Sequence, residues 1–122
     1  MKLFPALVLS LALCLLAPHS YGEDVAFTHT EYKVPMRDGV NLAISVFEPE
    51  GAGPWPVVLM RTPYNKANSE RRAQRYLEAG YVYAIQDCRG RYASEGEYVP
   101  FENDMEDGYD TIVKSADSSL KD

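Results

Sequence analysis

The chain has 122 residues, enough for one domain of modest core, and its 12 basic and 18 acidic side chains give a formal net charge of −6. Residues 1–22 hold one basic residue and no acid, so residues 23–122 carry 12 − 1 = 11 basic and 18 acidic residues, a net charge of −7. This acidic balance argues against nucleic acid and anionic membranes as partners.

The first 22 residues predict a secretory signal peptide. A short basic start precedes an apolar run over residues 3–16, and small, turn-prone residues follow. Ser20 and Gly22 have the spacing that signal peptidase requires, so we expect cleavage before Glu23 and a secreted or periplasmic protein. The alternative is an uncleaved anchor. The run is shorter than the roughly 20 residues that span a bilayer, so no stable membrane insertion is expected after cleavage.

Removal of the leader leaves a single cysteine, Cys88, and a single histidine, His29. No intramolecular disulfide can then form, even in an oxidising compartment. A thiol nucleophile at Cys88 would need His29 as its base. His29 is expected ahead of the main part of the first hairpin strand and has no orienting partner nearby in sequence, so thiol chemistry is disfavoured.

The folded part is expected to begin with a hairpin. Residues 28–36 and 40–47 have the composition of strands, and Asp38-Gly39 between them suits the positive φ angles of a tight turn. Residues 48–56 contain two glycines and three prolines, which predicts a surface connection. The short apolar run 57–60 that follows predicts a strand buried on both faces.

A strand–helix–strand unit is expected next. Ala73, Tyr76 and Leu77 have helical spacing within residues 69–79, and Gly80 stands where a helix-terminating glycine belongs. The alternative for this stretch is an irregular loop. Residues 81–85 predict a second strand, parallel to the first, and residues 86–96 a polar loop. The hairpin followed by this βαβ unit predicts a doubly wound α/β domain.

Residues 102–115 predict a second helix, weakly amphipathic through Met105, Tyr109, Ile112 and Val113. Its acidic residues are interpreted as a solvated face. A calcium loop is the alternative, but with Gly108 as its sixth residue the third and twelfth positions fall on residues without suitable oxygen ligands. The sequence therefore predicts no metal site, and nothing in it indicates a cofactor.

Candidate chemistry lies where the two parallel strands end, in residues 61–66 and 87–91. Pro63 restricts the backbone around Tyr64, whose neutral phenol could donate a hydrogen bond to an oxyanion. From position alone, a packed tyrosine is the more common reading. Arg89 and Arg91 could bind a substrate carboxylate, but ion pairs with Asp87 and Glu95 within the loop are favoured.

Several ordered segments resemble the X-Pro dipeptidyl-peptidase-like serine hydrolases. This is the CocE/NonD group, which includes cocaine esterase and the α-amino acid ester hydrolases. The resemblance is carried by residues 34–42 (VPMRDGVNL), 56–64 (PVVLMRTPY), 80–82 (GYV), 86–91 (QDCRGR), 94–98 (SEGEY) and 106–111 (EDGYDT). It covers the chain from about residue 32 to residue 111 and fades beyond.

That resemblance implies the N-terminal part of an α/β-hydrolase fold, with an incomplete sheet, over residues 23–122. It implies a Ser-Asp-His triad and a substrate that is a small ester, amide or peptide. Tyr64 corresponds to the tyrosine that donates to the oxyanion hole. The nucleophile of the family lies in a Gly-x-Ser-Tyr-x-Gly elbow, and neither Ser69 nor Ser94 has the Gly-x-Ser-x-Gly surroundings of such a nucleophile.

Two hypotheses follow from these observations. In the first, the chain is the opening segment of a secreted acyl-bond hydrolase, cut before the nucleophile elbow and inactive by itself. In the second, it is a truncated product without catalysis, or a small secreted interaction protein, an alternative prompted by the polar residues 114–119. A sheet left with an unpaired edge is expected to aggregate.

Overall fold

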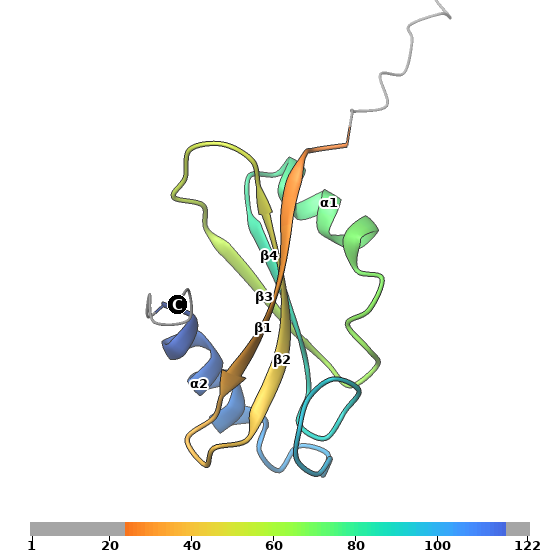
Figure 1. The fold of residues 1–122 in the computed structure, drawn as a ribbon, viewed down its shortest axis with the longest axis vertical. Helices are drawn as coiled ribbons and strands as arrows, with labels where there is room; N and C mark the ends of the chain where they lie inside the picture. The colour runs from red at the N-terminus through yellow and green to blue at the C-terminus, as the bar shows by residue number, and fades with distance from the viewer. Residues whose placement is uncertain (1–23, 117–122) are drawn as a thin grey trace, which may run out of the picture.

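The computed structural model describes residues 24–116 and shows a four-stranded mixed sheet with a helix on each face (Figure 1). The strand order is β1-β2-β4-β3; β2 is antiparallel to β1 and β4, and β3 is parallel to β4. The elements are β1 (Phe27–Pro35), β2 (Asn41–Pro49), β3 (Val57–Thr62), α1 (Glu70–Glu78), β4 (Val82–Asp87) and α2 (Asp104–Ala116). The predicted hairpin, βαβ unit and α/β class are confirmed.

The hairpin turn has the predicted chemistry. Gly39 has a φ of +85°, which a residue without Cβ adopts freely, and its amide donates to the carbonyl of Met36. The Asp38 carboxylate accepts from the Val40 amide at 3.2 Å. These bonds fix the register of β1 on β2, which places Glu31 opposite Ser45.

The first helix packs on one face of the sheet through the residues expected from the sequence. Ala73 and Leu77 are fully or almost fully buried against Phe47, Tyr83 and Ile85. The helix ends before Gly80, whose φ is +80°. Helical spacing with a terminating glycine therefore predicted this element correctly.

Strand β3 differs from its prediction. Residues 57–60 were expected to be buried on both faces, but Val57 is 62% exposed and the next three residues are only half-buried. All six residues of β4 are buried, because β4 lies between β2 and β3 whereas β3 is the outer strand of the described sheet. An apolar run alone does not distinguish these two positions in a sheet.

Both parallel strands are longer than predicted at their carboxyl ends. Arg61 and Thr62 belong to β3, and Gln86 and Asp87 belong to β4, so the loops begin after these residues. The side chains of Arg61 and Gln86 are hydrogen-bonded to each other at 3.0 Å. Polar residues at strand ends were taken for loop because their partners lie far away in sequence.

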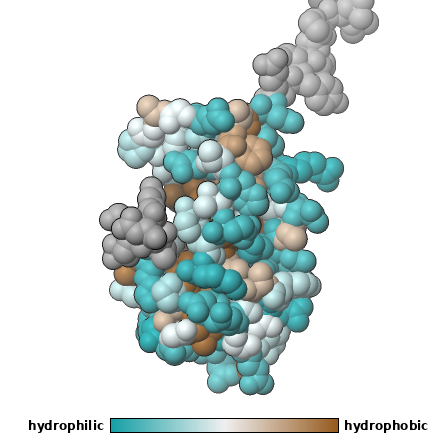
Figure 2. Space-filling model, in the orientation of Figure 1, coloured by the Kyte–Doolittle hydropathy of each residue, from teal (hydrophilic) through white to brown (hydrophobic). Residues whose placement is uncertain are grey.

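Helix α2 presents the opposite face from the one predicted. Its exposed residues include the four positions expected to pack, from 48% exposure at Val113 to 86% at Met105. Its buried side consists of Asp107, Asp110 and Thr111. The acids are buried because arginines from the turn and the strand ends face this helix. Apolar side chains interrupt the hydrophilic surface in the region of α2 (Figure 2).

The predicted leader, residues 1–22, lies outside the described residues, as does the polar tail beyond residue 116. Within residues 24–116 no helix combines the length and hydropathy needed to cross a membrane. The same residues contain no group of three or more His, Cys, Asp or Glu side chains arranged to hold a metal ion.

Candidate functional site

The carboxyl ends of β3 and β4 lie together at the lower end of the sheet in Figure 1, the same end as the β1–β2 turn. The parallel pairing sets Thr62 level with Asp87 at this edge. In an open α/β sheet this edge is where reactive groups gather. The structure thus brings together the two loops that were singled out in the sequence.

Tyr64 is 83% exposed at this edge, two residues after the end of β3. Its amide donates to the Thr62 hydroxyl at 3.1 Å, and the Arg91 guanidinium donates to the Pro63 carbonyl at 3.0 Å. Asn65 follows with a φ of +82°. The loop backbone is therefore held on both sides of a phenol that is open to solvent.

Asp87 connects the loop after β3 to the loop after β4. Its buried carboxylate accepts from the Lys66 amide at 2.8 Å and from the Ala93 amide at 3.2 Å. It bonds to backbone and not to Arg89 or Arg91, so the ion pair predicted between Asp87 and the loop arginines is wrong. Its position at the end of β4 makes it the connection between the Tyr64 loop and residues 88–96.

A second polar cluster lies on the α1 face of the sheet. The Lys66 ammonium donates to Glu31 at 2.5 Å and to the Ser45 hydroxyl at 2.8 Å, and Ser45 donates to Glu31 at 2.5 Å. His29 adds a contact to Glu31 at 2.9 Å. Burial opposes ionisation of Glu31, but the hydrogen bonds from Lys66, Ser45 and His29 lower the pKa of its carboxyl overall. Sequence reasoning missed this cluster, because its residues come from β1, β2 and the β3–α1 loop.

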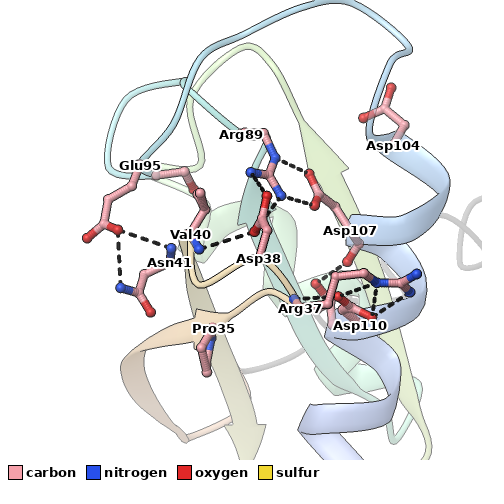
Figure 3. A network of polar contacts seen from close by, with 12 residues as sticks. Pro35, Arg37, Asp38, Val40, Asn41, Arg89, Glu95, Asp104, Asp107 and Asp110 are labelled. Carbon is pink, nitrogen blue, oxygen red and sulfur yellow. Dashed lines mark hydrogen bonds and ion pairs between the residues drawn. The ribbon is translucent and has the colours of Figure 1, made fainter.

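Arg89 makes the central ion pairs of the opposite face (Figure 3). It donates to Asp107 at 2.6 and 3.0 Å and to Asp38 at 2.7 Å. The preference for a structural role is confirmed, but its partners are on α2 and in the hairpin turn. The sequence predicted a turn role for Asp38, and the structure adds an ion pair with Arg89 to that role. Arg89 thereby fastens the turn, the end of β4 and α2 together.

Two further arginines face α2. Arg37 donates through its side chain to both oxygens of Asp110, at 2.8 to 3.2 Å, and through its amide at 2.8 Å (Figure 3). Arg61 donates to the Asp104 carbonyl at 2.8 Å and lies 3.7 Å from Asp107. The interpretation of the α2 acids as a solvated face is wrong for Asp107 and Asp110, which are buried ion-pair partners.

Stability in acid should depend on the Arg37–Asp110 pair. The hydrogen bonds from Arg37 lower the pKa of Asp110 to about 2, against the opposing effect of burial. Because the folded pKa lies below the ordinary value of about 3.9, the pair stabilises the fold above about pH 4 and loses this contribution as the pH falls toward 2. In Arg37→Gln the melting temperature should fall less between pH 5 and pH 2 than in the unchanged protein; parallel curves would contradict the assignment.

Arg91 is not paired with Glu95, contrary to the sequence expectation. Its guanidinium lies over the rings of Tyr92 and Tyr98, 5.1 and 5.0 Å from their centroids, besides its bond to Pro63. Glu95 instead accepts from Asn41. Arg91 therefore braces the Tyr64 loop from the side of residues 92–98.

The rival nucleophiles are engaged elsewhere. Cys88 is buried, and burial raises the pKa of its thiol, which disfavours the thiolate. His29 stacks on Phe47 with ring centroids 4.4 Å apart. It belongs to β1, which β2 separates from β4, the strand that Cys88 follows. The hydroxyls of Ser69 and Ser94 donate to backbone carbonyls. The Tyr64 side chain, in contrast, remains freely accessible at this edge.

The class of protein follows from the arrangement and its structural neighbours: the described residues have a partial α/β-hydrolase fold. An α-amino acid ester hydrolase shares the fold with a TM-score of 0.67 and 29% identity, covering 87% of this chain and 22% of its own. An aminopeptidase from a marine sediment Thaumarchaeota archaeon gives 0.67 and 28%, covering 84% and 21%. A CocE/NonD family hydrolase from Staphylococcus aureus gives 0.66 and 25%, covering 77% and 21%.

The chain belongs to the X-Pro dipeptidyl-peptidase (S15) family, whose model matches residues 38–113. It is also 44% identical over 85 residues to cocaine esterase from Rhodococcus sp. (strain MB1 Bresler), a match that spans 65% of this chain and 15% of the esterase. The chain thus corresponds to about a fifth or less of the length of these relatives. The family is one of esterase- and peptidase-type hydrolases, as the sequence motifs indicated.

Proposed function

We propose that residues 23–122 form the N-terminal portion of the hydrolase domain of a secreted or periplasmic serine hydrolase that cleaves esters or amides. The observation that carries the proposal is the exposed Tyr64 phenol at the carboxyl edge of β3, on a loop fixed by Thr62 and Arg91, inside the family match. In this role the Tyr64 hydroxyl donates a hydrogen bond to the carbonyl oxygen of the substrate as that oxygen gains negative charge.

A tyrosine suits this task chemically. The phenol is neutral at pH 7, so it stabilises an oxyanion without a counter-charge that would also hold the ground state. Because negative charge on the oxygen develops only in the transition state, the hydrogen bond strengthens there and raises kcat. A serine nucleophile, its histidine base, the acid that orients the histidine and a second oxyanion donor are assigned to chain outside the described residues.

The names of the relatives support a proposal for the substrate class. Their names specify an ester, amino acid esters and peptides, so a small-molecule ester, amide or peptide is proposed for the complete protein. The 122-residue piece is proposed to be inactive by itself. The leader over residues 1–22 would direct export from the cytoplasm, and its cleavage before Glu23 would leave a protein without stable membrane insertion.

The reading frame tests this proposal first. We expect it to continue past Asp122 into a Gly-x-Ser-Tyr-x-Gly elbow, and the encoded protein to hydrolyse a p-nitrophenyl ester in a manner abolished by a serine-directed inhibitor. A frame without such an elbow, or hydrolysis by residues 23–122 alone, would contradict it.

The alternative is a non-catalytic truncated product or a small secreted interaction protein, and the exposed apolar side chains bear on whether such a product is stable alone. Val57 on the outer strand and Met105 and Ile112 on α2 are 62%, 86% and 62% exposed. Exposed apolar surface beside an open sheet edge promotes association. Residues 23–122, purified alone, are therefore expected to aggregate, and a sharp cooperative thermal transition in a monomer would show instead that the piece is an independent protein.

A further inference from the structure

Lys66 is a buried lysine whose side chain lies along the α1 face of the sheet and reaches β2 and β1. It follows β3, its amide is bound by Asp87 at the end of β4, and its ammonium reaches Ser45 on β2 and Glu31 on β1. Only 9% of its side chain is exposed. One residue of the loop that carries Tyr64 is therefore tied to three of the four strands.

Two hydrogen-bond partners hold the Lys66 ammonium in this position. A buried charge is costly unless it is paired and hydrogen-bonded, and Lys66 has both a carboxylate and a hydroxyl within 2.8 Å. The contacts make its placement specific, because an ammonium shifted by one residue along the loop would lose them. Lys66 thus fixes the far end of the loop that begins at Pro63.

The loop needs such a restraint. Asn65 and Asn68 have φ angles of +82° and +58°, a conformation that residues with a Cβ adopt at a cost. A backbone of this kind persists where its surroundings determine it. The Arg91 bond to Pro63 holds the loop before Tyr64, and the contacts of Lys66 hold it after.

A serine and a lysine in contact also suggest a nucleophile pair, but the geometry argues against it. Ser45 is 3% exposed, so a substrate carbonyl has no access to it. Its hydroxyl donates to Glu31, and the same carboxylate binds the Lys66 ammonium. The side chains of Glu31, Ser45 and Lys66 bond to one another. The backbone of residues 64–66 connects this cluster to Tyr64 at the reactive edge.

We propose that Lys66, held by Glu31 and Ser45, is a positioning residue that fixes Tyr64 in the orientation required for oxyanion stabilisation. The inference rests on the proposed function of Tyr64. Lys66 does not touch the substrate. It restricts the backbone two residues after Tyr64, and a displacement of a catalytic group by about 1 Å can cost roughly 10² in rate.

The test is a double-mutant cycle in the complete hydrolase, with a p-nitrophenyl ester as substrate. Lys66→Met should lower kcat by about tenfold or more and leave KM within about twofold, because an oxyanion donor acts in the transition state. In the Tyr64→Phe background the same substitution should have little further effect, because the hydroxyl that it misplaces is already absent. Lys33→Met, the same substitution at an exposed lysine of β1 that contacts Ala93, should leave kcat unchanged.

The outcomes separate the two proposals. If Tyr64→Phe has no effect, the proposed function fails; if it lowers kcat and Lys66→Met does not, only the positioning role fails. An equal loss from Lys66→Met in both backgrounds would also overturn the role, since general destabilisation does not require the Tyr64 hydroxyl. Should Lys66→Met not fold, Ser45→Ala removes one of the two ammonium contacts and enters the same cycle, with a smaller loss expected that again vanishes without the hydroxyl.

Discussion

Tyr64→Phe is expected to lower kcat of the complete hydrolase on an ester substrate by roughly 10², which corresponds to about 2.7 kcal/mol of transition-state stabilisation. The substitution removes one hydroxyl and keeps the ring, so the loop held by Thr62 and Arg91 should stay in place. KM should change little, because the lost hydrogen bond strengthens only as charge develops on the substrate oxygen.

Tyr81→Phe is the matched control for this prediction. Tyr81 is also exposed, at 38%, but it precedes β4 and so lies at the opposite end of the sheet from Tyr64. Its hydroxyl should be irrelevant to hydrolysis. An unchanged kcat in Tyr64→Phe, or an equal loss in both variants, would exclude Tyr64 as an oxyanion donor.

Asp107→Ala is expected to destabilise the docking of α2 by about 3 to 5 kcal/mol. Asp107 is 1% exposed and faces Arg89 at 2.6 Å and Arg61 at 3.7 Å. The side chains of these arginines are only 12% and 15% exposed. Removal of the Asp107 carboxylate leaves the Arg61 and Arg89 guanidinium groups with one partner fewer in a poorly solvated place. The resulting loss of stability exceeds the net stabilisation that the intact ion pairs provide.

Hydrogen exchange of the α2 amides measures this change as a lower free energy of local opening. Asp104→Ala is the control on the same helix, because the Asp104 side chain is 48% exposed and its contact with Arg61 is 3.3 Å. Because the Asp104 carboxylate is half-exposed, this pair is expected to contribute about 1 kcal/mol or less. Equal losses in the two variants would contradict the central place given to Asp107.

The parts of the fold that depend on local chemistry could be predicted. Asp38-Gly39 specified the hairpin turn, and Ala73, Leu77 and Gly80 specified the first helix and its end. The order of strands and helix was enough to give a mixed α/β sheet. Each of these signals lies within a few residues of the structure that it determines.

The orientation of α2 could not be predicted, because its partners lie far away in sequence. Arg37 and Arg89 are 73 and 18 residues from the acids that they bind. A prediction from helical periodicity places aspartates on the solvent-facing side of a helix and tyrosine or isoleucine on the buried side. The ion pairs with these arginines reverse that assignment, because they bury Asp107 and Asp110 and leave the apolar positions of α2 exposed.

The candidate site was only partly accessible to sequence reasoning. Tyr64 was singled out through family resemblance, since a tyrosine after a strand is by itself an ordinary feature. Lys66 was included in the same loop but given no role, because Glu31 and Ser45 are 35 and 21 residues away. The available signal was Lys66 itself, a lysine in the loop after β3. Its ammonium needs an acidic partner if the folded sheet buries it.

Labelling of the natural protein with a serine-directed fluorophosphonate tests the central claim most directly. The protein that begins at Glu23 should extend beyond Asp122, hydrolyse a p-nitrophenyl ester, and carry one covalent adduct on the serine of a Gly-x-Ser-Tyr-x-Gly sequence. A protein that ends at Asp122, or one that takes up no adduct and still hydrolyses the ester, would contradict the assignment of this chain to a serine hydrolase with Tyr64 in its oxyanion hole.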